Sequence, residues 1–210
     1  MSIMKSVKKS TYPFLESIGV YEGQAPLLPY HQARVDRTFA AFYPGQNSLD
    51  LLDLWQKASF PSEKVKWRIQ YNALEQKAEI CAFPERKIEY LQVVKDDTIE
   101  YAYKFTERDR LDVLYREKAE PADEILIIRN GLLTDAYYYN VVVKTESGLL
   151  TPRMPLLAGV MRAYCLEKEQ VQLADIRMDD LKNSEGIYLI NALHPLERAA
   201  FIGREQIIWE

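Results

Sequence analysis

The feature that most constrains the fold of this chain is a series of short segments in which apolar and polar residues alternate. Segments 64–74, 77–84 and 88–94 follow one another, and each is rich in β-branched or aromatic residues. Alternation with a period of two places every second side chain on the same face, which is typical of a strand. The pattern therefore predicts a group of short strands in the first half of the chain.

Helical spacing precedes these strands. A strand, a turn at Glu22–Gly23 and a second strand are expected within 14–28, followed by a helix at 31–43. A second helix is expected at 48–58, where Ser48 is suited to cap the first turn. We therefore predict an α+β domain over residues 1–95.

The second half, residues 96–210, has the same mixed character and is predicted to be a second domain. Its expected strands lie at 98–105, 124–131, 136–144, 148–152 and 186–193, its helices at 108–119 and from about 159 to 173, and a hairpin at 199–209. The fold class predicted from these patterns is α+β.

Composition excludes several classes of function. A net charge of -4 and a pI near 5.4 give no basic surface for nucleic acid or anionic membranes. Cys81 and Cys165 are far apart, and His31 and His194 are too few for a metal cluster, so no metal site or disulfide framework is predicted. The sequence shows no signal peptide and no apolar run of about 18 residues, which favours the cytoplasm.

Four motifs carry the functional information. They are HQARV at 31–35, YAYKFTERDRLDVL at 101–114, LTDAYYYN at 133–140 and LLTPRMPLLAGVMR at 149–162. In this order they resemble the class IV, or branched-chain-aminotransferase-like, pyridoxal-phosphate enzymes of fold type IV, and the resemblance covers nearly the whole chain. It implies a small N-terminal α/β sandwich domain, a C-terminal β-barrel-like domain with flanking helices, and a homodimer.

The first two motifs imply a phosphate ligand and a catalytic lysine. By its position Arg34 would bind the phosphate of pyridoxal 5'-phosphate, for which a planar guanidinium group is well suited. Lys104 would carry the cofactor aldehyde as a Schiff base and then act as the proton-transferring base. The asparagine that the family usually has shortly after the lysine is absent, and Glu107 stands near its place.

The other two motifs imply contacts to the cofactor ring and phosphate. Asp135, where the family usually has glutamate, would keep the pyridine nitrogen protonated, with Asn140 five residues later. The backbone N–H groups of Val160 and Met161 would bind the phosphate at a helix N-terminus that follows Gly159. Arg162 is interpreted as structural.

A fifth segment separates members of the family. The resemblance associates the run N-A-L-x-P, which begins here with Asn191 and Ala192, with the lyase that cleaves 4-amino-4-deoxychorismate to 4-aminobenzoate and pyruvate in folate biosynthesis. The alternatives are a class IV aminotransferase for branched-chain or D-amino acids, and a family member that has lost its chemistry and serves as a binding or structural protein.

The expected substrate is a small molecule that bears an amine and a carboxylate, so an arginine should face it. The candidates are Arg68, Arg108, Arg110 and Arg153, and the sequence does not choose among them. Alternation within a strand would place Tyr137 and Tyr139 on one face and Tyr138 on the other.

Overall fold

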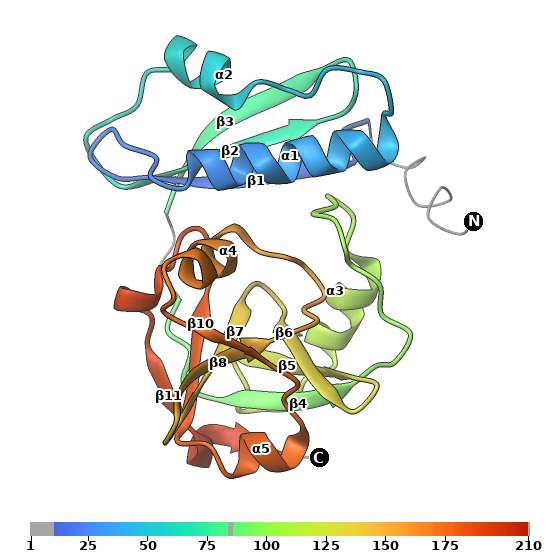
Figure 1. Ribbon diagram of the computed structural model, residues 1–210, viewed down its shortest axis with the longest axis vertical. Helices are drawn as coiled ribbons and strands as arrows, with labels where there is room; N and C mark the ends of the chain where they lie inside the picture. The colour runs from blue at the N-terminus through green and yellow to red at the C-terminus, as the bar shows by residue number, and fades with distance from the viewer. Residues whose placement is uncertain (1–10, 84–85, 210) are drawn as a thin grey trace. The chain divides into compact units, whose positions relative to one another are not determined.

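The computed structural model describes residues 11–83 and 86–209, and its contacts divide the chain into two compact units (Figure 1). The first unit comprises Met1–Pro84 and Tyr103–Glu107, and the second comprises Glu85–Ala102 and Arg108–Glu210. The mixed α and β architecture predicted from the sequence is confirmed.

The first unit contains a three-stranded antiparallel sheet in the order β1-β2-β3, with helix α1 against it (Figure 1). Its elements are β1 Phe14–Val20, α1 Leu28–Phe42, α2 Leu51–Lys57, β2 Val65–Tyr71 and β3 Gln76–Ala82. The apolar stripe of α1 and the inward positions of β1 and β2 form one core, which includes Val35, Phe39, Ile18 and Trp67. Strand alternation and helical spacing thus bury complementary faces.

The short segment Tyr103–Glu107 joins this core although it lies between elements of the second unit. Phe105 forms a bridge with Phe14, the carbonyl of Lys104 accepts the Leu15 N–H at 3.1 Å, and the rings of Phe42 and Tyr103 lie 4.8 Å apart. The domains expected from the sequence met at residue 95. The contacts group residues 86–95 with the second unit and Tyr103–Glu107 with the first, where the partly buried rings of Tyr103 and Phe105 pack against its core.

The second unit is built on a nine-stranded mixed sheet. Its elements are β4 Leu91–Lys95, α3 Asp109–Arg116, β5 Glu124–Arg129, β6 Leu132–Ala136, β7 Asn140–Thr145, β8 Gly148–Pro152, α4 Val160–Glu167, β9 Gln172–Ala174, α5 Met178–Lys182, β10 Gly186–Ile190, the 3₁₀ turn Leu196–Arg198, β11 Phe201–Gly203, the 3₁₀ turn Arg204–Gln206 and β12 Ile207–Ile208. The strand order is β11-β10-β7-β6-β5-β4-β12, and β8 pairs with both β7 and β9.

Continuous apolar runs place the core of this unit on the central strands. The side chains of β5 and β7 are buried on both faces over most of their length, as in Leu126, Ile127, Val141 and Val142. A strand that is covered on both faces loses the alternating pattern. These two strands therefore lie in the core of the second unit.

Several predicted elements are wrong or shorter than expected. The segment 98–105 forms a loop and not a strand. The terminal segment 199–209 is not a hairpin, because β11 pairs with β10 whereas β12 pairs with β4. The helix expected from Gly159 to Leu173 ends at Glu167, and the opening strand is followed only by a bridge between Tyr21 and Gln24.

The cap predicted for the second helix is also wrong. Asp50, not Ser48, caps α2, since its carboxylate accepts the N–H groups of Leu52 at 2.9 Å and Asp53 at 3.0 Å. The Ser48 hydroxyl instead donates to Asp36 at 2.6 Å. Serine and aspartate are both common at the N-cap position, but the charged carboxylate of aspartate is the stronger acceptor for the N–H groups of a helix N-terminus.

The three consecutive tyrosines do not lie in a strand. Strand β6 ends at Ala136 and β7 begins at Asn140, so Tyr137, Tyr138 and Tyr139 form the connection, which we call the tyrosine turn. Alternation therefore does not apply to them. The rings of Tyr137 and Tyr138 lie next to each other, 4.2 Å apart, instead of on opposite faces.

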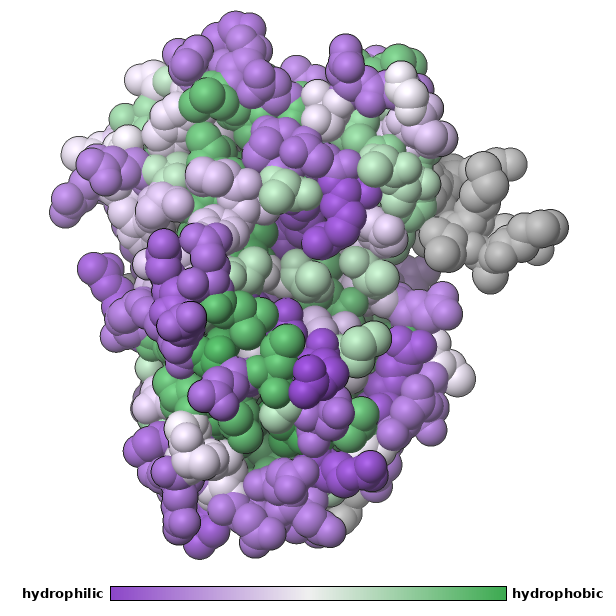
Figure 2. Space-filling model, in the orientation of Figure 1, coloured by the Kyte–Doolittle hydropathy of each residue, from purple (hydrophilic) through white to green (hydrophobic). Residues whose placement is uncertain are grey.

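The face in Figure 2 carries apolar and hydrophilic residues side by side. Large exposed apolar side chains over the described residues include Leu74, Met154 and Leu173. Within the same residues the structure contains no helix whose length and apolarity would allow it to span a membrane.

We expect Leu126→Ala to lower the free energy of unfolding of the second unit by about 2–5 kcal/mol, because Leu126 is fully buried and its truncation leaves a cavity. The matched substitution Leu173→Ala, at a side chain that is 41% exposed, should cost less than about 1 kcal/mol. Urea unfolding followed by circular dichroism measures both, and equal losses would contradict the assigned core.

Candidate active site

The eight residues predicted from the motifs divide between the two units. Arg34 and Lys104 belong to the first unit, and Asp135, Asn140, Val160, Met161, Asn191 and Ala192 belong to the second. In each unit a buried acid holds one of these side chains: Glu16 contacts Arg34, and Asp135 contacts Asn140.

In the first unit the acid is Glu16, on β1. Its side chain is fully buried. The carboxylate accepts hydrogen bonds from Nε of Arg34, at 2.9 Å, and from Nη2 of the same residue. It also contacts Nδ1 of His31. Burial alone would raise the pKa of Glu16, but the charge of Arg34 and the His31 hydrogen bond together lower the pKa to about 2. Glu16 is therefore a carboxylate that fixes Arg34 and His31 on the adjacent helix α1.

His31 is neutral in this cluster. Burial, together with the charges of Arg34 and Lys104, lowers its pKa, and these effects outweigh the opposing influence of Glu16. Since Nδ1–H donates to the carboxylate, Nε2 is left as an acceptor, and it is buried without a partner among the described residues. The effect of Lys104 on His31 places the lysine amine within electrostatic range of this cluster.

The structure gives Arg34 a second task besides the predicted one. Nε and Nη2 of its guanidinium donate to Glu16, so the side chain that is predicted to bind the phosphate is also oriented by a buried carboxylate. Sequence reasoning did not single out Glu16. The available signal was an acid at an otherwise inward-facing position of an alternating strand, where an unpaired charge is not tolerated.

In the second unit the acid is Asp135, at the end of β6. Oδ1 accepts Nδ2 of Asn140 at 2.7 Å, and Oδ2 accepts the N–H of Leu157 at 2.8 Å. Nδ2 of Asn140 also donates to the carbonyl of Leu157 at 2.9 Å. We call this set of three residues the Asp135 clamp, and it fastens the 153–159 loop to the paired ends of β6 and β7.

Burial dominates the chemistry of Asp135. Its pKa is raised to about 7 by desolvation, although the hydrogen bonds from Leu157 and Asn140 and the charge of Arg162 all lower the pKa. A cationic N–H beside Asp135 would stabilise the carboxylate form. A carboxylate offers about four lone-pair sites, so the two donors from Asn140 and Leu157 leave acceptor capacity for a ring nitrogen.

The clamp also explains why residue 159 is glycine. Gly159 has φ −73°, which any residue adopts, so the glycine is not required by backbone conformation. A Cβ atom there would lie 1.8 Å from Oδ1 of Asn140, so only glycine leaves room for the amide.

Helix α4 begins directly after Gly159. No side chain caps this end, and the first amides of an α-helix have no partner within the helix, which suits them to an anion. The Val160 and Met161 side chains are buried, so their role toward a phosphate would fall to their backbone N–H groups. Arg162 donates to the carbonyl of Pro152 at 2.6 Å, in agreement with its interpretation as structural.

Asn191 forms a turn after β10. Its Oδ1 accepts the N–H groups of Leu193 at 2.9 Å and His194 at 3.0 Å, and its Nδ2 donates to the carbonyl of Tyr138 at 3.2 Å. Ala192 lies within this turn. The structure thus connects the N-A-L-x-P segment to the tyrosine turn.

A third buried acid, Glu124, supports the tyrosine turn. Its Oε1 accepts hydrogen bonds from the N–H groups of Ile125 at 2.9 Å and Tyr137 at 3.1 Å. Its Oε2 has no hydrogen-bond donor among the described residues and lies 4.0 Å from Nη1 of Arg86. Burial raises the pKa of Glu124 to about 7 against these hydrogen bonds and the charge of Arg86. No sequence motif pointed to Glu124.

The described residues also include an open hollow of about 610 Å³ in the first unit. It is lined by Leu28, Pro29, Gln32, Asp36, Asn47, Ser48, Asp50 and Leu52. None of the predicted functional residues borders it, and a hollow without convergent catalytic groups does not define an active site.

Comparison with known proteins identifies the family. A sequence model described as Amino-transferase class IV matches residues 86–200, more than half of the chain. The chain belongs to the class IV aminotransferase family. The match spans Asp135, Asn140, the start of α4 and the Asn191 turn.

Similar proteins agree with this assignment. An uncharacterized protein of Haemophilus influenzae is 28% identical over 189 residues, which are 88% of this chain and all of that protein. A crystal structure from Haemophilus somnus 129PT, provisionally named a 4-amino-4-deoxychorismate lyase, is 32% identical with a TM-score of 0.84, over 89% of this chain and 99% of that one.

More distant structures share the fold, which is fold type IV as predicted. A provisionally named amino-acid aminotransferase from Mesorhizobium loti is 19% identical with a TM-score of 0.76, over 94% of this chain and 99% of that one. A hypothetical aminotransferase from Mycobacterium tuberculosis, in a PLP-bound form, is 17% identical with a TM-score of 0.72, over 90% of this chain and 80% of that one.

We expect Glu124→Gln to flatten the dependence of stability on pH. Because the pKa of Glu124 is about 7 in the folded state and lower in the unfolded state, its contribution to stability is complete below pH 4.5 and is lost as the pH rises through 7. The loss between pH 5 and pH 8 should shrink by on the order of 3 kcal/mol at most.

Urea unfolding at pH 5 and pH 8 measures this difference. The exposed substitution Glu117→Gln, which carries the same charge change, is the control and should keep the wild-type dependence. An unchanged pH dependence in Glu124→Gln would show that this carboxyl ionises equally well in both states.

Proposed function

We propose that the protein is a pyridoxal-phosphate-dependent lyase that cleaves 4-amino-4-deoxychorismate to 4-aminobenzoate and pyruvate. The observation that carries this proposal is the 32% identity, over 89% of this chain, to the Haemophilus somnus protein provisionally named for that activity. The N-A-L-x-P segment that begins at Asn191 supports the same choice.

The residues of the chain fit the cofactor. Membership of the class IV family and the PLP-bound and PMP-bound Mycobacterium tuberculosis structures support pyridoxal phosphate. Asp135 is a buried acid with acceptor capacity for a ring N–H, and the uncapped start of α4 offers amides to a phosphate. Lys104 is the proposed covalent attachment point, and Arg34 the second phosphate ligand.

In the proposed reaction Lys104 performs the proton transfers. When it is bound, pyridoxal phosphate supplies the electron sink for negative charge that develops beside the substrate nitrogen. Nζ of Lys104 removes the proton from the nitrogen-bearing ring carbon. The bond between the neighbouring ring carbon and the enolpyruvyl oxygen then breaks, and the ring becomes aromatic.

The second proton transfer completes the reaction. Lys104 returns the proton to the enolpyruvyl fragment, which leaves as pyruvate, so no water, oxidant or reductant is consumed. A cationic ring nitrogen beside Asp135 would keep this acid a carboxylate, since an opposite charge lowers its raised pKa. Exclusion of water from this acid keeps the interaction strong.

The direct test supplies 4-amino-4-deoxychorismate to the purified protein. We expect 4-aminobenzoate and pyruvate in equal amounts, dependent on pyridoxal phosphate. The family assignment keeps an aminotransferase as the second candidate. Amino transfer from an amino acid to a 2-oxo acid, without release of pyruvate from aminodeoxychorismate, would establish that candidate and overturn the lyase proposal.

A residue-level prediction concerns the lysine. Borohydride treatment of the protein with pyridoxal phosphate should leave a stable adduct on Lys104, and Lys104→Ala should abolish the adduct and reduce turnover by at least about 10³-fold. The control is Lys168→Ala, at a side chain that is 52% exposed, and this variant should retain both the adduct and the turnover.

Peptide mass spectrometry locates the adduct. Its presence on a lysine other than Lys104 would refute the assignment of that residue. A protein that forms no adduct and develops no visible colour with pyridoxal phosphate would be the inactive family member instead.

A further inference from the structure

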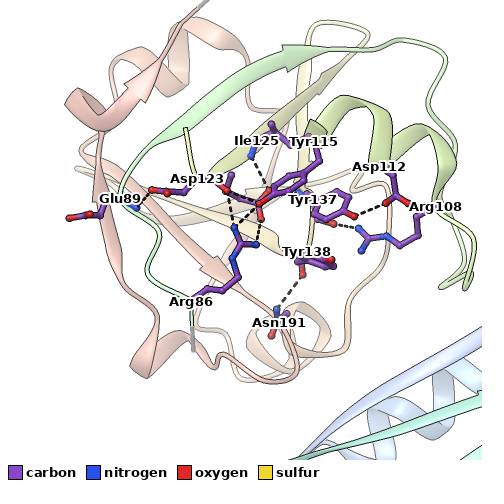
Figure 3. A network of polar contacts seen from close by, with 11 residues as sticks. Arg86, Glu89, Arg108, Asp112, Tyr115, Asp123, Ile125, Tyr137, Tyr138 and Asn191 are labelled. Carbon is purple, nitrogen blue, oxygen red and sulfur yellow. Dashed lines mark hydrogen bonds and ion pairs between the residues drawn. The ribbon is translucent and has the colours of Figure 1, made fainter. Parts of the chain in front are cut away.

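The tyrosine turn and the residue that precedes α3 form a compact aromatic and cationic cluster in the second unit (Figure 3). The ring of Tyr137 stacks on Tyr115 of α3 at 4.2 Å and 17°, and meets Tyr138 edge-on at 4.2 Å and 67°. The guanidinium carbon of Arg108 lies 4.1 Å from the centre of the Tyr137 ring and 4.5 Å from that of Tyr138. Arg108 is therefore held against two aromatic faces.

Arg108 is under-satisfied for a largely enclosed cation. Its Nη2 donates to the carbonyl of Tyr137, and no carboxylate forms an ion pair with it among the described residues. Its Nε is buried and has no hydrogen-bond acceptor in the same part of the chain. An unpaired donor on a cation is costly, and a carboxylate is the ligand that satisfies a guanidinium best.

The other arginines that the sequence offered are already paired with acids. Arg68 contacts Glu79 at 2.6 Å, Arg110 contacts Asp96, and Arg153 lies 3.4 Å from Asp175. An external carboxylate would have to displace an existing partner at each of these three. Arg108 alone among the four candidates offers its charge without such a competitor.

The cluster is held in place before any ligand arrives. Glu124 accepts the N–H of Tyr137, Asn191 donates to the carbonyl of Tyr138, and the Tyr137 hydroxyl donates to Asp112 at 2.5 Å. These three contacts come from β5, the Asn191 turn and α3. A group that is fixed in this way loses little entropy when a ligand binds.

The chain links the cluster to the Asp135 clamp. The tyrosine turn lies between Ala136 and Asn140, and the N–H of Ala136 donates to the carbonyl of Tyr139 at 2.9 Å. The tyrosines are therefore set by the same strand pair that positions Asp135 and Asn140. Tyr138 remains 50% exposed and is therefore accessible to a flat ligand.

We propose that Arg108 binds a carboxylate of the substrate and that the exposed ring of Tyr138 packs against the substrate ring. This inference rests on the proposed function and adds to it a residue that selects ring-bearing carboxylates. Arg108 and Tyr138 act through binding, and neither transfers a proton.

The test measures binding of 4-aminobenzoate, which carries both the ring and the carboxylate, by isothermal titration calorimetry. It is carried out on the protein as purified and after addition of pyridoxal phosphate. Arg108→Gln should weaken binding by about 10–100-fold, and Arg108→Lys, which keeps the charge but loses the planar fork, by an intermediate factor. Arg116→Gln, at the exposed end of the same helix, is the control and should bind as wild type does.

Tyr138 is tested in parallel. Tyr138→Leu should weaken binding of 4-aminobenzoate by about 5–10-fold while Tyr138→Phe restores it, because the ring and not the hydroxyl makes the contact. In turnover of 4-amino-4-deoxychorismate, these variants should raise KM more than they lower kcat, with the visible absorbance of bound pyridoxal phosphate unchanged. A purely structural role would alter that absorbance and the melting temperature instead.

Chemical protection in the unmutated protein covers the case in which a variant fails to fold. Phenylglyoxal should modify Arg108 more slowly when 4-aminobenzoate is present, as read by peptide mass spectrometry, and the modification of Arg116 should not change. Absence of protection, or variants that bind as Arg116→Gln does, would overturn the inference. Binding at Arg108 without release of pyruvate from aminodeoxychorismate would refute the proposed function alone.

Discussion

The buried carboxyl of Asp135 is the constraint on which the second unit depends. One oxygen holds the amide of Asn140 and the other holds the backbone N–H of Leu157, so a single acid ties a strand pair to the loop that leads into α4. The geometry is tight enough that residue 159 must lack a Cβ atom. The position of the α4 N-terminus thus follows from the placement of one side chain.

Burial of Asp135 destabilises the folded protein when the carboxyl group is ionised and no cation lies beside it. Burial raises the pKa of Asp135 to about 7, whereas in the first unit Arg34 and His31 lower the pKa of Glu16 to about 2. The difference lies in the partners: Glu16 has a cation in contact, and Asp135 has neutral donors with Arg162 only as a more distant charge. A buried acid that lacks a cationic contact is common where a ligand supplies the missing charge.

Lys104 belongs to the first unit although the chain before Tyr103 and after Glu107 belongs to the second. Lys104 and Phe105 pair with β1 of the first unit. The backbone of the proposed catalytic lysine is held by this pairing and by the packing of Tyr103 and Phe105 against the core of the first unit. Its amine also lowers the pKa of His31.

Much of the fold could be predicted from periodicity, because the central strands and α1 bury continuous or regularly spaced apolar residues. The tyrosine turn could not be predicted. Three aromatic residues favour a strand by propensity, and only the contacts with Arg108, Glu124 and Tyr115 make them a turn. The lysine segment failed as a strand for the same reason, since tertiary packing outweighed local preference.

Residues of the candidate site could be predicted from the sequence only where they belong to motifs with fixed spacing. Asp135 and Asn140 are five residues apart and do meet, and the glycine before α4 has a necessary role. Glu16 and Glu124 belong to no such pattern. Their importance depends on burial, which arises only when distant elements pack around them.

The central claim is that the Asp135 clamp presents the first amides of α4 to the phosphate of the cofactor. Hydrogen–deuterium exchange over residues 157–162, with pyridoxal phosphate compared against pyridoxal, tests it most directly. The account predicts slower exchange at Val160 and Met161 with pyridoxal phosphate and little change with pyridoxal, which lacks the phosphate. Unchanged exchange in protein that has bound pyridoxal phosphate, or equal slowing by both compounds, would contradict it.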